Sequence, residues 1–320
     1  MIHPSLFFRR PFLEGFSEKK RNNKKGAEQG LEDKETCALA EIFLPNIKSY
    51  EEFVSLLKLI YRGVKHSLLL PCHQEATEEV VHRNMRMGIG LTGILQCSKE
   101  QMSWLDPAYK ELRAFDKYYS EKLGIPVSIK LTTIKPSGTM SLLPGVTPGA
   151  HPAFAQYLIR RMRISSNHPI VQVCRDHGYH VEYQENFDGS KDFSTVVVSF
   201  PMSYPAGTRL AEDMTAIDQL EVIKFLQKNW SDNSVSCTVY YSLEELPGVI
   251  EYLNKNYKDN FKTLSFLLKE NHGFKQAPLE KITKEQYEEM IRKVKPIDRI
   301  DSFLTDLDDA DCAGGACPIR

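Results

Sequence analysis

Apolar residues recur at helical spacing in several stretches of the chain. Between positions 53 and 64, one face of a helix would carry Phe53, Leu56, Leu57, Ile60 and Val64. The preceding Ser49 and Glu52 have the spacing of a capping box, so an amphipathic helix is predicted to begin at Ser49. A second helix is predicted to run from Asp106, as an N-cap before a proline, to a stop at Gly124.

Residues of alternating polarity indicate strands between the helices. Strand patterns occur at 127–131, 195–200 and 236–241, and a helix is predicted over 217–229. Two further capping-box spacings precede apolar-periodic helices: Ser242 with Glu245, and Thr283 with Gln286. Because helix and strand alternate to about residue 295, the predicted fold class is α/β with substantially parallel strands.

Composition narrows the classes of partner and compartment. The chain has 41 basic and 42 acidic residues, so bulk charge gives no attraction to nucleic acid or to an anionic membrane. No apolar run approaches the roughly 18 residues of a membrane span. The 7 scattered cysteines are unlike a disulfide framework and favour a reducing, cytoplasmic compartment. Residues 1–25 are basic and predict a poorly ordered leader, with an organelle presequence or nuclear signal as the alternative.

The C-terminal residues 296–320 include an acidic run and end in DCAGGACPIR, a composition that predicts a mobile tail. The Ala-Gly-Gly-Ala spacer lets the sulfurs of Cys312 and Cys317 approach within disulfide range at little steric cost. A zinc site is the alternative, but it needs four ligands, and the nearest histidine in sequence is the distant His272.

We therefore predict that the two tail cysteines form a redox pair. A dithiol on a mobile arm can carry electrons from an external reductant, such as thioredoxin, to a buried internal disulfide. A thiol oxidoreductase acting through these two cysteines alone is a further alternative, but the chain lacks the Cys-x-x-Cys signature of that class.

Several blocks of sequence, in the same order, resemble the monomeric adenosylcobalamin-dependent ribonucleoside-triphosphate reductases. The resemblance runs from about Glu28 to Arg320. The blocks are RNMRMGIG at 83–90, KPSGT at 135–139, YLIRRMR at 157–163, NWSDNSVSCT at 229–238 and the terminal DCAGGACPIR.

The resemblance implies a fold and an activity. The fold is the C-terminal part of a ten-stranded α/β barrel over 26–295, with a flexible redox tail over 296–320 and unrelated sequence over 1–25. The activity is reduction of ribonucleoside triphosphates to deoxyribonucleotides for DNA synthesis, in which adenosylcobalamin initiates a cysteine thiyl radical and a cysteine pair delivers two electrons. Thioredoxin or a similar dithiol would then reduce the tail cysteines. Most contacts to adenosylcobalamin are implied to lie upstream of the matching region.

The resemblance also implies catalytic residues. Cys37, in Cys-Ala-Leu-Ala-Glu-Ile-Phe, matches one member of the reducing pair; the alternative is a small buried hydrophobe. Glu28 matches the carboxylate that exchanges protons with substrate hydroxyls; the alternative is a surface glutamate. Gly26 stands where the radical cysteine is expected, and glycine has no sulfur. We therefore expect little or no reductase activity from the isolated chain, and an inactive fragment or partner-binding remnant is the alternative function.

A short loop is the candidate phosphate site. Backbone amides at the start of a following helix, together with hydroxyls, can hold phosphate oxygens after a strand. The resemblance assigns the substrate's phosphates to Pro136, Ser137, Gly138 and Thr139.

Other notable residues are interpreted as structural. The thiols expected to be incidental or part of the core are Cys72, Cys97, Cys174 and Cys237. Trp230, Asp232 and Asn233 are predicted to form a helix-to-strand corner whose polar side chains satisfy backbone groups. No resident metal is expected.

Overall fold

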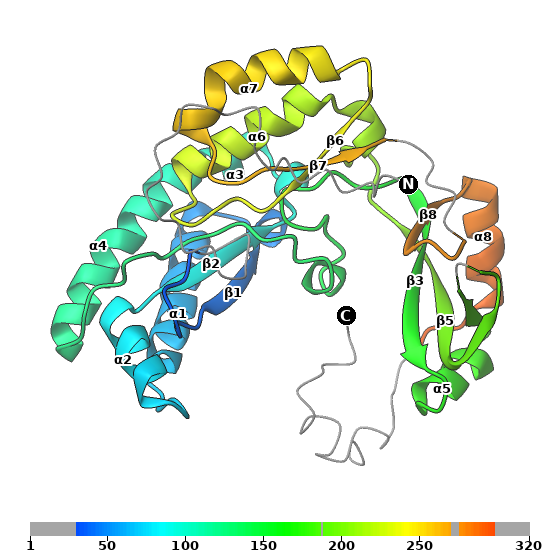
Figure 1. The fold of residues 1–320 in the computed structure, drawn as a ribbon, viewed down its shortest axis with the longest axis horizontal. Helices are drawn as coiled ribbons and strands as arrows, with labels where there is room; N and C mark the ends of the chain where they lie inside the picture. The colour runs from blue at the N-terminus through cyan, green and yellow to red at the C-terminus, as the bar shows by residue number, and fades with distance from the viewer. Residues whose placement is uncertain (1–29, 187, 270–274, 298–320) are drawn as a thin grey trace. The chain divides into compact units, whose positions relative to one another are not determined.

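A computed structural model describes residues 30–186, 188–269 and 275–297 of the chain (Figure 1). The described residues form two compact units. The first contains 30–153 and 208–269, and the second contains 154–207 and 275–297. The region predicted as one partial barrel, 26–295, therefore contains two units.

The first unit is built on parallel strands. β1 (Ala38–Phe43) pairs in parallel with β2 (Met87–Thr92), and β6 (Thr238–Tyr241) pairs in parallel with β7 (Ser265–Leu268). All six positions of β2 are buried, as expected for a parallel strand covered on both faces.

An extended segment, 131–134, joins these two pairs of strands. Its Thr132 forms a parallel bridge to Ile89 of β2, and its Ile134 forms a parallel bridge to Val235, just before β6. The backbone thus runs as one parallel layer in the order β1, β2, 131–134, 235–241 and β7. The alternating pattern at 127–131 lies mostly before this segment and forms no regular strand, because pairing with β2 begins only at Lys130.

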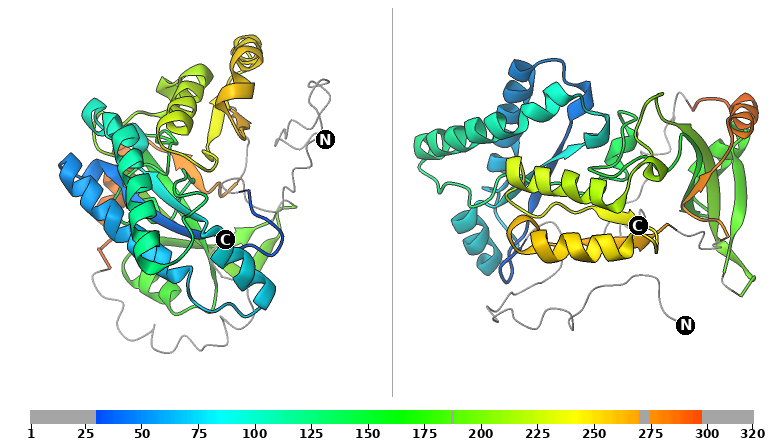
Figure 2. Two further views of the ribbon diagram at one scale, coloured as in Figure 1. Left: turned by 90° about the vertical axis from the view of Figure 1, so that its left-hand side faces the viewer. Right: turned by 90° about the horizontal axis from the view of Figure 1, so that it is seen from above.

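Helices pack against this layer. They are α1 (Tyr50–Ser67), α2 (Glu75–Asn84), α3 (Lys99–Ser103), α4 (Leu105–Leu123), α6 (Ala216–Asn229) and α7 (Leu246–Asn260). Short 3-10 turns are η1 (Leu44–Asn46), η2 (Ile94–Gln96), η3 (Met140–Leu142) and η4 (Ala211–Asp213). α1 packs on both β1 and β2 and on α4, and α6 and α7 run side by side (Figure 2). Phe53, Leu112 and Trp230 meet in this core, where burial of each apolar side chain stabilises the fold by about 1.5–3 kcal/mol.

Helix starts follow the predicted caps with one correction. The Ser49 hydroxyl accepts a hydrogen bond from the Glu52 amide at 3.2 Å, as predicted. Asp106 is not an N-cap, because α3 continues through Trp104 directly into α4, which begins at Leu105. Asp106 instead lies in the first turn of α4, where its charge favours the helix dipole.

The other two predicted capping boxes differ from each other. The box of Thr283 and Gln286 is complete at the start of α8 (Lys284–Lys293). At Ser242 only half is present: its amide donates to Glu245 at 2.7 Å, and α7 has no side-chain cap.

The second unit departs from the predicted substantially parallel arrangement of strands. Its sheet is antiparallel, in the order β4 (His180–Glu185), β5 (Lys191–Ser203), β3 (Tyr157–Ser165) and β8 (Leu279–Lys281). α5 (Ile170–Asp176) and α8 belong to the same unit. Only a short turn joins β4 to β5, and a parallel pair would need a long crossover there.

Candidate active site

The structure places the predicted site residues in two groups. Glu28, Cys312 and Cys317 lie outside the described residues. Cys37 and the loop 136–139 are described, and both belong to the first unit. Cys37 immediately precedes β1, and the loop follows the extended segment 131–134.

Cys37 is exposed. Because side chains alternate along a strand, Cys37, Leu39 and Glu41 share one face, and Ile42 points to the other. Leu39 is 41% exposed, whereas Ile42 is 1% exposed in the helix-covered core. The Cys37 face is therefore the one turned away from the core, and the reading of Cys37 as a buried hydrophobe does not hold.

A buried carboxylate fixes the chain just before Cys37. Glu35 accepts hydrogen bonds from Arg86 Nε at 2.8 Å and from Asn84 Nδ2 at 3.0 Å through Oε1. Its Oε2 accepts from the Glu32 amide at 2.8 Å. Three donors satisfy this charge, so the start of β1 is held firmly against the start of β2. Sequence reasoning used the Arg-Asn-Met-Arg block only as a resemblance and missed this function.

The predicted phosphate loop has an unusual backbone at its second residue. Ser137 has φ of 50°, in the left-handed region that few residues other than glycine adopt. The Ser137 carbonyl accepts from the Ser141 amide at 2.9 Å, which closes the loop onto η3. The helix expected after the loop is only this 3-10 turn, so it contributes little helix dipole. Thr139, at its start, makes no side-chain capping hydrogen bond.

A second loop, which contains Gly149 and His151, packs against the first residue of the Lys-Pro-Ser-Gly-Thr block. Gly149 has φ of 53°, and a side chain there would collide with the carbonyl oxygen of Lys135. Nearby, the His151 ring is within 3.1 Å of the Pro148 carbonyl through Nδ1, and its Nε2 accepts from the Thr238 amide at 3.0 Å. Burial lowers the pKa of His151, so the neutral ring that makes both bonds is favoured. His151 is thus a structural link between this loop and β6.

The cysteine strand and the phosphate loop are connected by an ion pair that sequence reasoning missed. Glu41, on the Cys37 face of β1, lies 3.2 Å from Lys135 Nζ through Oε2. The Glu41 side chain is 1% exposed. Its burial raises the pKa, and the Lys135 charge and the Ser137 hydroxyl oppose that rise. The available signal was the single charged residue in an otherwise apolar strand.

The predicted helix-to-strand corner is confirmed. Trp230 Nε1 donates to the Thr133 carbonyl at 3.2 Å, and Asp232 accepts from the Leu131 amide at 2.9 Å. Asn233 Nδ2 donates to the Thr132 carbonyl at 2.8 Å. These bonds hold the extended segment that leads into the phosphate loop.

The remaining described thiols agree with the structural interpretation. Cys174 and Cys237 are buried, and Cys72 and Cys97 are partly buried. Burial raises the pKa of both Cys97 and Cys237 to about 12, so neither is a thiolate at neutral pH. Within the described ranges, no group of three or more His, Cys, Asp or Glu residues could hold a metal ion. Nor do these ranges contain a helix long and apolar enough to cross a membrane.

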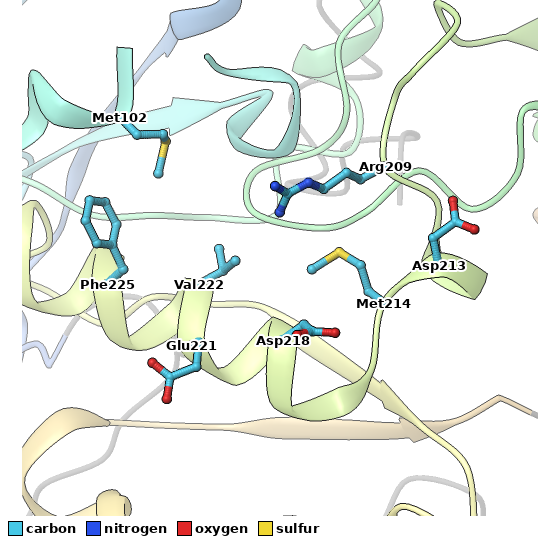
Figure 3. A pocket seen from close by; sticks show the side chains of 8 residues that line it. All are labelled: Met102, Arg209, Asp213, Met214, Asp218, Glu221, Val222 and Phe225. Atoms are coloured by element: carbon cyan, nitrogen blue, oxygen red, sulfur yellow. The ribbon is translucent and has the colours of Figure 1, made fainter. Parts of the chain in front are cut away.

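A separate cavity of about 700 Å³ lies between α3 and α6 (Figure 3). Its lining residues are Met102, Arg209, Asp213, Met214, Asp218, Glu221, Val222 and Phe225. None of them belongs to β1 or to the phosphate loop, so this cavity is not part of the predicted site.

Comparisons with known proteins confirm the predicted resemblance. No family model matches the chain. An adenosylcobalamin-dependent ribonucleoside-triphosphate reductase of Euglena gracilis is 38% identical over 274 residues, which cover 84% of this chain and 37% of the relative. A probable enzyme of the same name from Dictyostelium discoideum is 36% identical over 304 residues, covering 91% of this chain and 39% of the relative.

A bacterial relative and a solved structure agree. The enzyme of the same name from Lactobacillus leichmannii is 30% identical over 340 residues, covering 92% of this chain and 45% of the relative. The crystal structure of a B-12 dependent (class II) ribonucleotide reductase matches with a TM-score of 0.74 at 26% identity, over 92% of this chain and 44% of that one. The chain thus spans less than half the length of these proteins.

Proposed function

We propose that this chain, a partial homologue of the adenosylcobalamin-dependent ribonucleoside-triphosphate reductases, supplies the phosphate loop and one reducing cysteine for converting ribonucleoside triphosphates to deoxyribonucleotides in DNA synthesis. One observation carries the proposal. The ion pair between Glu41 and Lys135 ties the base of the loop 136–139 to the strand that begins directly after Cys37.

The spacing along β1 suits an extended nucleotide. Cys37 and Glu41 share a face of the strand and lie four positions apart, which is about 13 Å at roughly 3.3 Å per residue. A substrate whose phosphates lie on the loop beside Glu41 would extend its ribose along this face toward Cys37. The loop would bind phosphate oxygens through its backbone amides, including that of Ser137, and through the hydroxyl of Thr139.

The reaction assigned to the cysteines balances as a two-electron reduction. A ribose carbon exchanges its hydroxyl for a hydrogen: the C–O bond breaks, the oxygen leaves as water and a C–H bond forms. Two thiols supply the two electrons and two protons and become a disulfide. Cys37 would be one of these thiols, and Glu28 would move protons at the ribose hydroxyls. Cys312 and Cys317 would reduce the disulfide by thiol exchange, with thioredoxin or a similar dithiol as the final donor.

Adenosylcobalamin, when bound, supplies the radical that initiates this chemistry in the family. We assign none of the described residues to it. The cavity of Figure 3 is lined by apolar side chains, three carboxylates and Arg209, and it shares no residue with β1 or the loop. The proposal for the described residues is therefore limited to holding substrate and donating electrons.

The finer architecture is also a proposal. The parallel layer of the first unit would be part of a ten-stranded α/β barrel. Residues 1–25 would be an unrelated leader, 26–295 the partial barrel region and 296–320 a redox tail.

A nucleotide-binding measurement tests the phosphate loop. A Cβ atom at Gly138 would meet nothing within 4 Å, so substitution there is expected to leave the fold intact. Gly138→Glu places a carboxylate among the phosphates and is expected to weaken ribonucleoside-triphosphate binding at least about 10-fold through charge repulsion. Gly138→Ala is the matched control and is expected to bind nearly as the original chain. Equal binding by all three would refute the loop assignment.

An activity assay tests the alternative of an inactive or partner-binding fragment. Because Gly26 carries no sulfur, the purified chain should produce little or no deoxynucleotide when given a ribonucleoside triphosphate, adenosylcobalamin and a dithiol. Substantial deoxynucleotide formation would overturn this expectation and favour an active enzyme.

A further inference from the structure

We infer that Glu41 is a positioning residue that sets the phosphate loop through Lys135. The inference rests on the proposed phosphate-binding function of the loop. It adds a role for a residue that neither the sequence motifs nor the comparisons assign.

The Glu41 side chain occupies space left by Gly90, its neighbour in the sheet. Glu41 lies opposite Gly90 in the register of β1 with β2. A Cβ atom at position 90 would stand 2.6 Å from Glu41 Oε2. The carboxylate therefore lies directly over Gly90, and a side chain at position 90 would displace it.

The polar groups at the base of the loop are buried but incompletely bonded. Apart from the ion pair with Lys135, neither carboxylate oxygen of Glu41 makes a regular hydrogen bond within the described residues. The buried hydroxyl of Ser137 lacks a regular hydrogen bond in the same way. Leaving such groups unsatisfied costs free energy, so this arrangement is poor at stabilising the fold by itself.

The geometry of Lys135 indicates that the pair with Glu41 fixes the conformation of the loop. Lys135 is the first residue of the Lys-Pro-Ser-Gly-Thr block, and its carbonyl packs against Gly149. With its ammonium held by Glu41 and its carbonyl against Gly149, Lys135 is fixed at both ends. The following residues, including the left-handed Ser137, are then presented in one conformation. A binding group preorganised in this way loses less entropy when the ligand arrives.

The test uses the complete chain with inorganic tripolyphosphate and ATP as probes, and binding is followed by calorimetry. Glu41→Gln and Lys135→Met are each expected to weaken tripolyphosphate binding about 10-fold, since misplaced binding groups lose affinity on this scale. The double variant should bind about as weakly as either single variant, because the ion pair with Lys135 is the main link from Glu41 to the loop. Lys135→Arg, which keeps the cation, should retain most of the affinity.

A matched control separates positioning from stability. Asp116→Asn alters another buried ion pair in the same unit, with Lys65 at 3.1 Å, away from the loop residues. This variant should melt at a lower temperature and still bind tripolyphosphate with unchanged affinity in its folded state. If Asp116→Asn weakened binding as much as Glu41→Gln, general destabilisation would explain both and the inference would fail.

The pH dependence of tripolyphosphate affinity distinguishes positioning from a purely structural role, which would not change that dependence. Lys135 is the charged side chain that acts on the Glu41 carboxylate. Affinity should fall as acidification protonates Glu41, beyond the change caused by protonation of tripolyphosphate itself. Glu41→Gln should show only the ligand's own change.

The outcomes distinguish the two proposals. If the original chain binds and Glu41→Gln binds equally well with the same pH profile, the positioning role is refuted and the phosphate loop survives. If the original chain binds neither probe, the phosphate loop itself is refuted, together with the inference that depends on it.

Discussion

Two buried ion pairs of the first unit, Lys65 with Asp116 and Lys135 with Glu41, differ in how completely their hydrogen bonds are formed. Lys65 of α1 donates to Asp116 of α4 at 3.1 Å, to the Pro126 carbonyl at 2.8 Å and to Ser128 Oγ at 2.9 Å. Asp116 also accepts from the Tyr61 hydroxyl at 2.6 Å. Every proton of this ammonium has a partner.

The pair of Glu41 and Lys135 has no such set of bonds. The Glu41 oxygens, buried as deeply, lack regular hydrogen bonds in the described part of the chain. Where a polar cluster holds helices together, its hydrogen bonds are complete; beside the candidate phosphate loop they are not. This contrast supports the proposal that the Glu41 side of the strand layer takes a ligand.

The largest expected effect comes from breaking the satisfied pair. Lys65→Met leaves the Asp116 carboxylate buried without its cation, and such a loss typically costs about 3–5 kcal/mol of unfolding free energy. Urea denaturation monitored by circular dichroism measures this change. A loss below about 1 kcal/mol would show that the pair is not the anchor its geometry indicates.

A smaller effect on stability is expected at His151, which lies beside the candidate phosphate loop and has hydrogen-bond partners at both ring nitrogens. His151 is buried and bonded at both ring nitrogens, and its pKa is lowered in the folded state. The unfolded chain therefore takes up a proton at higher pH than the folded chain does. Stability should fall as pH drops below the ordinary histidine value near 6.5, by about 1.4 kcal/mol per pH unit until the lowered pKa is reached.

The control for this prediction is a variant without a titrating ring. His151→Gln should lose some stability at neutral pH and show a flatter dependence between pH 6.5 and 5. Denaturation midpoints across this range measure it. An unchanged slope in the variant would assign the acid sensitivity to other groups.

The smallest expected effect on stability is at Glu41. Acidification changes the Glu41 contribution to stability in the direction opposite to that of His151. Burial raises the pKa of Glu41 in the folded state, so the protonated carboxyl stabilises the fold at low pH. That contribution is lost as pH rises through the raised pKa. Glu41→Gln should then be as stable as the original chain at pH 7, within about 0.5 kcal/mol, or slightly more stable.

The two ion pairs predict opposite outcomes for stability at neutral pH. Thermal melting at pH 7 should separate Lys65→Met, which is strongly destabilised, from Glu41→Gln, which is not. If Glu41→Gln were destabilised as much as Lys65→Met, the two pairs would be equivalent structural pairs and the contrast between them would disappear.

Local patterns predicted much of the fold. The helix that begins at Ser49, the stop at Gly124 and the strand within 195–200 are all present because each depends on neighbours in sequence. The helix-to-strand corner at Trp230 was also predictable, since its short polar residues favour backbone hydrogen bonds. The family resemblance, carried by motif blocks, was likewise available from the sequence alone.

Sequence determined which residues could carry the chemistry: thiols at Cys37, Cys312 and Cys317, and hydroxyls and amides in the loop 136–139. Tertiary structure alone decided that Glu41 reaches Lys135, far along the chain, and that β3 and β5 pair antiparallel in a separate unit. The physical reason is range. Periodicity and capping report interactions within a few residues, whereas strand partners and buried charge pairs form only when distant segments pack together.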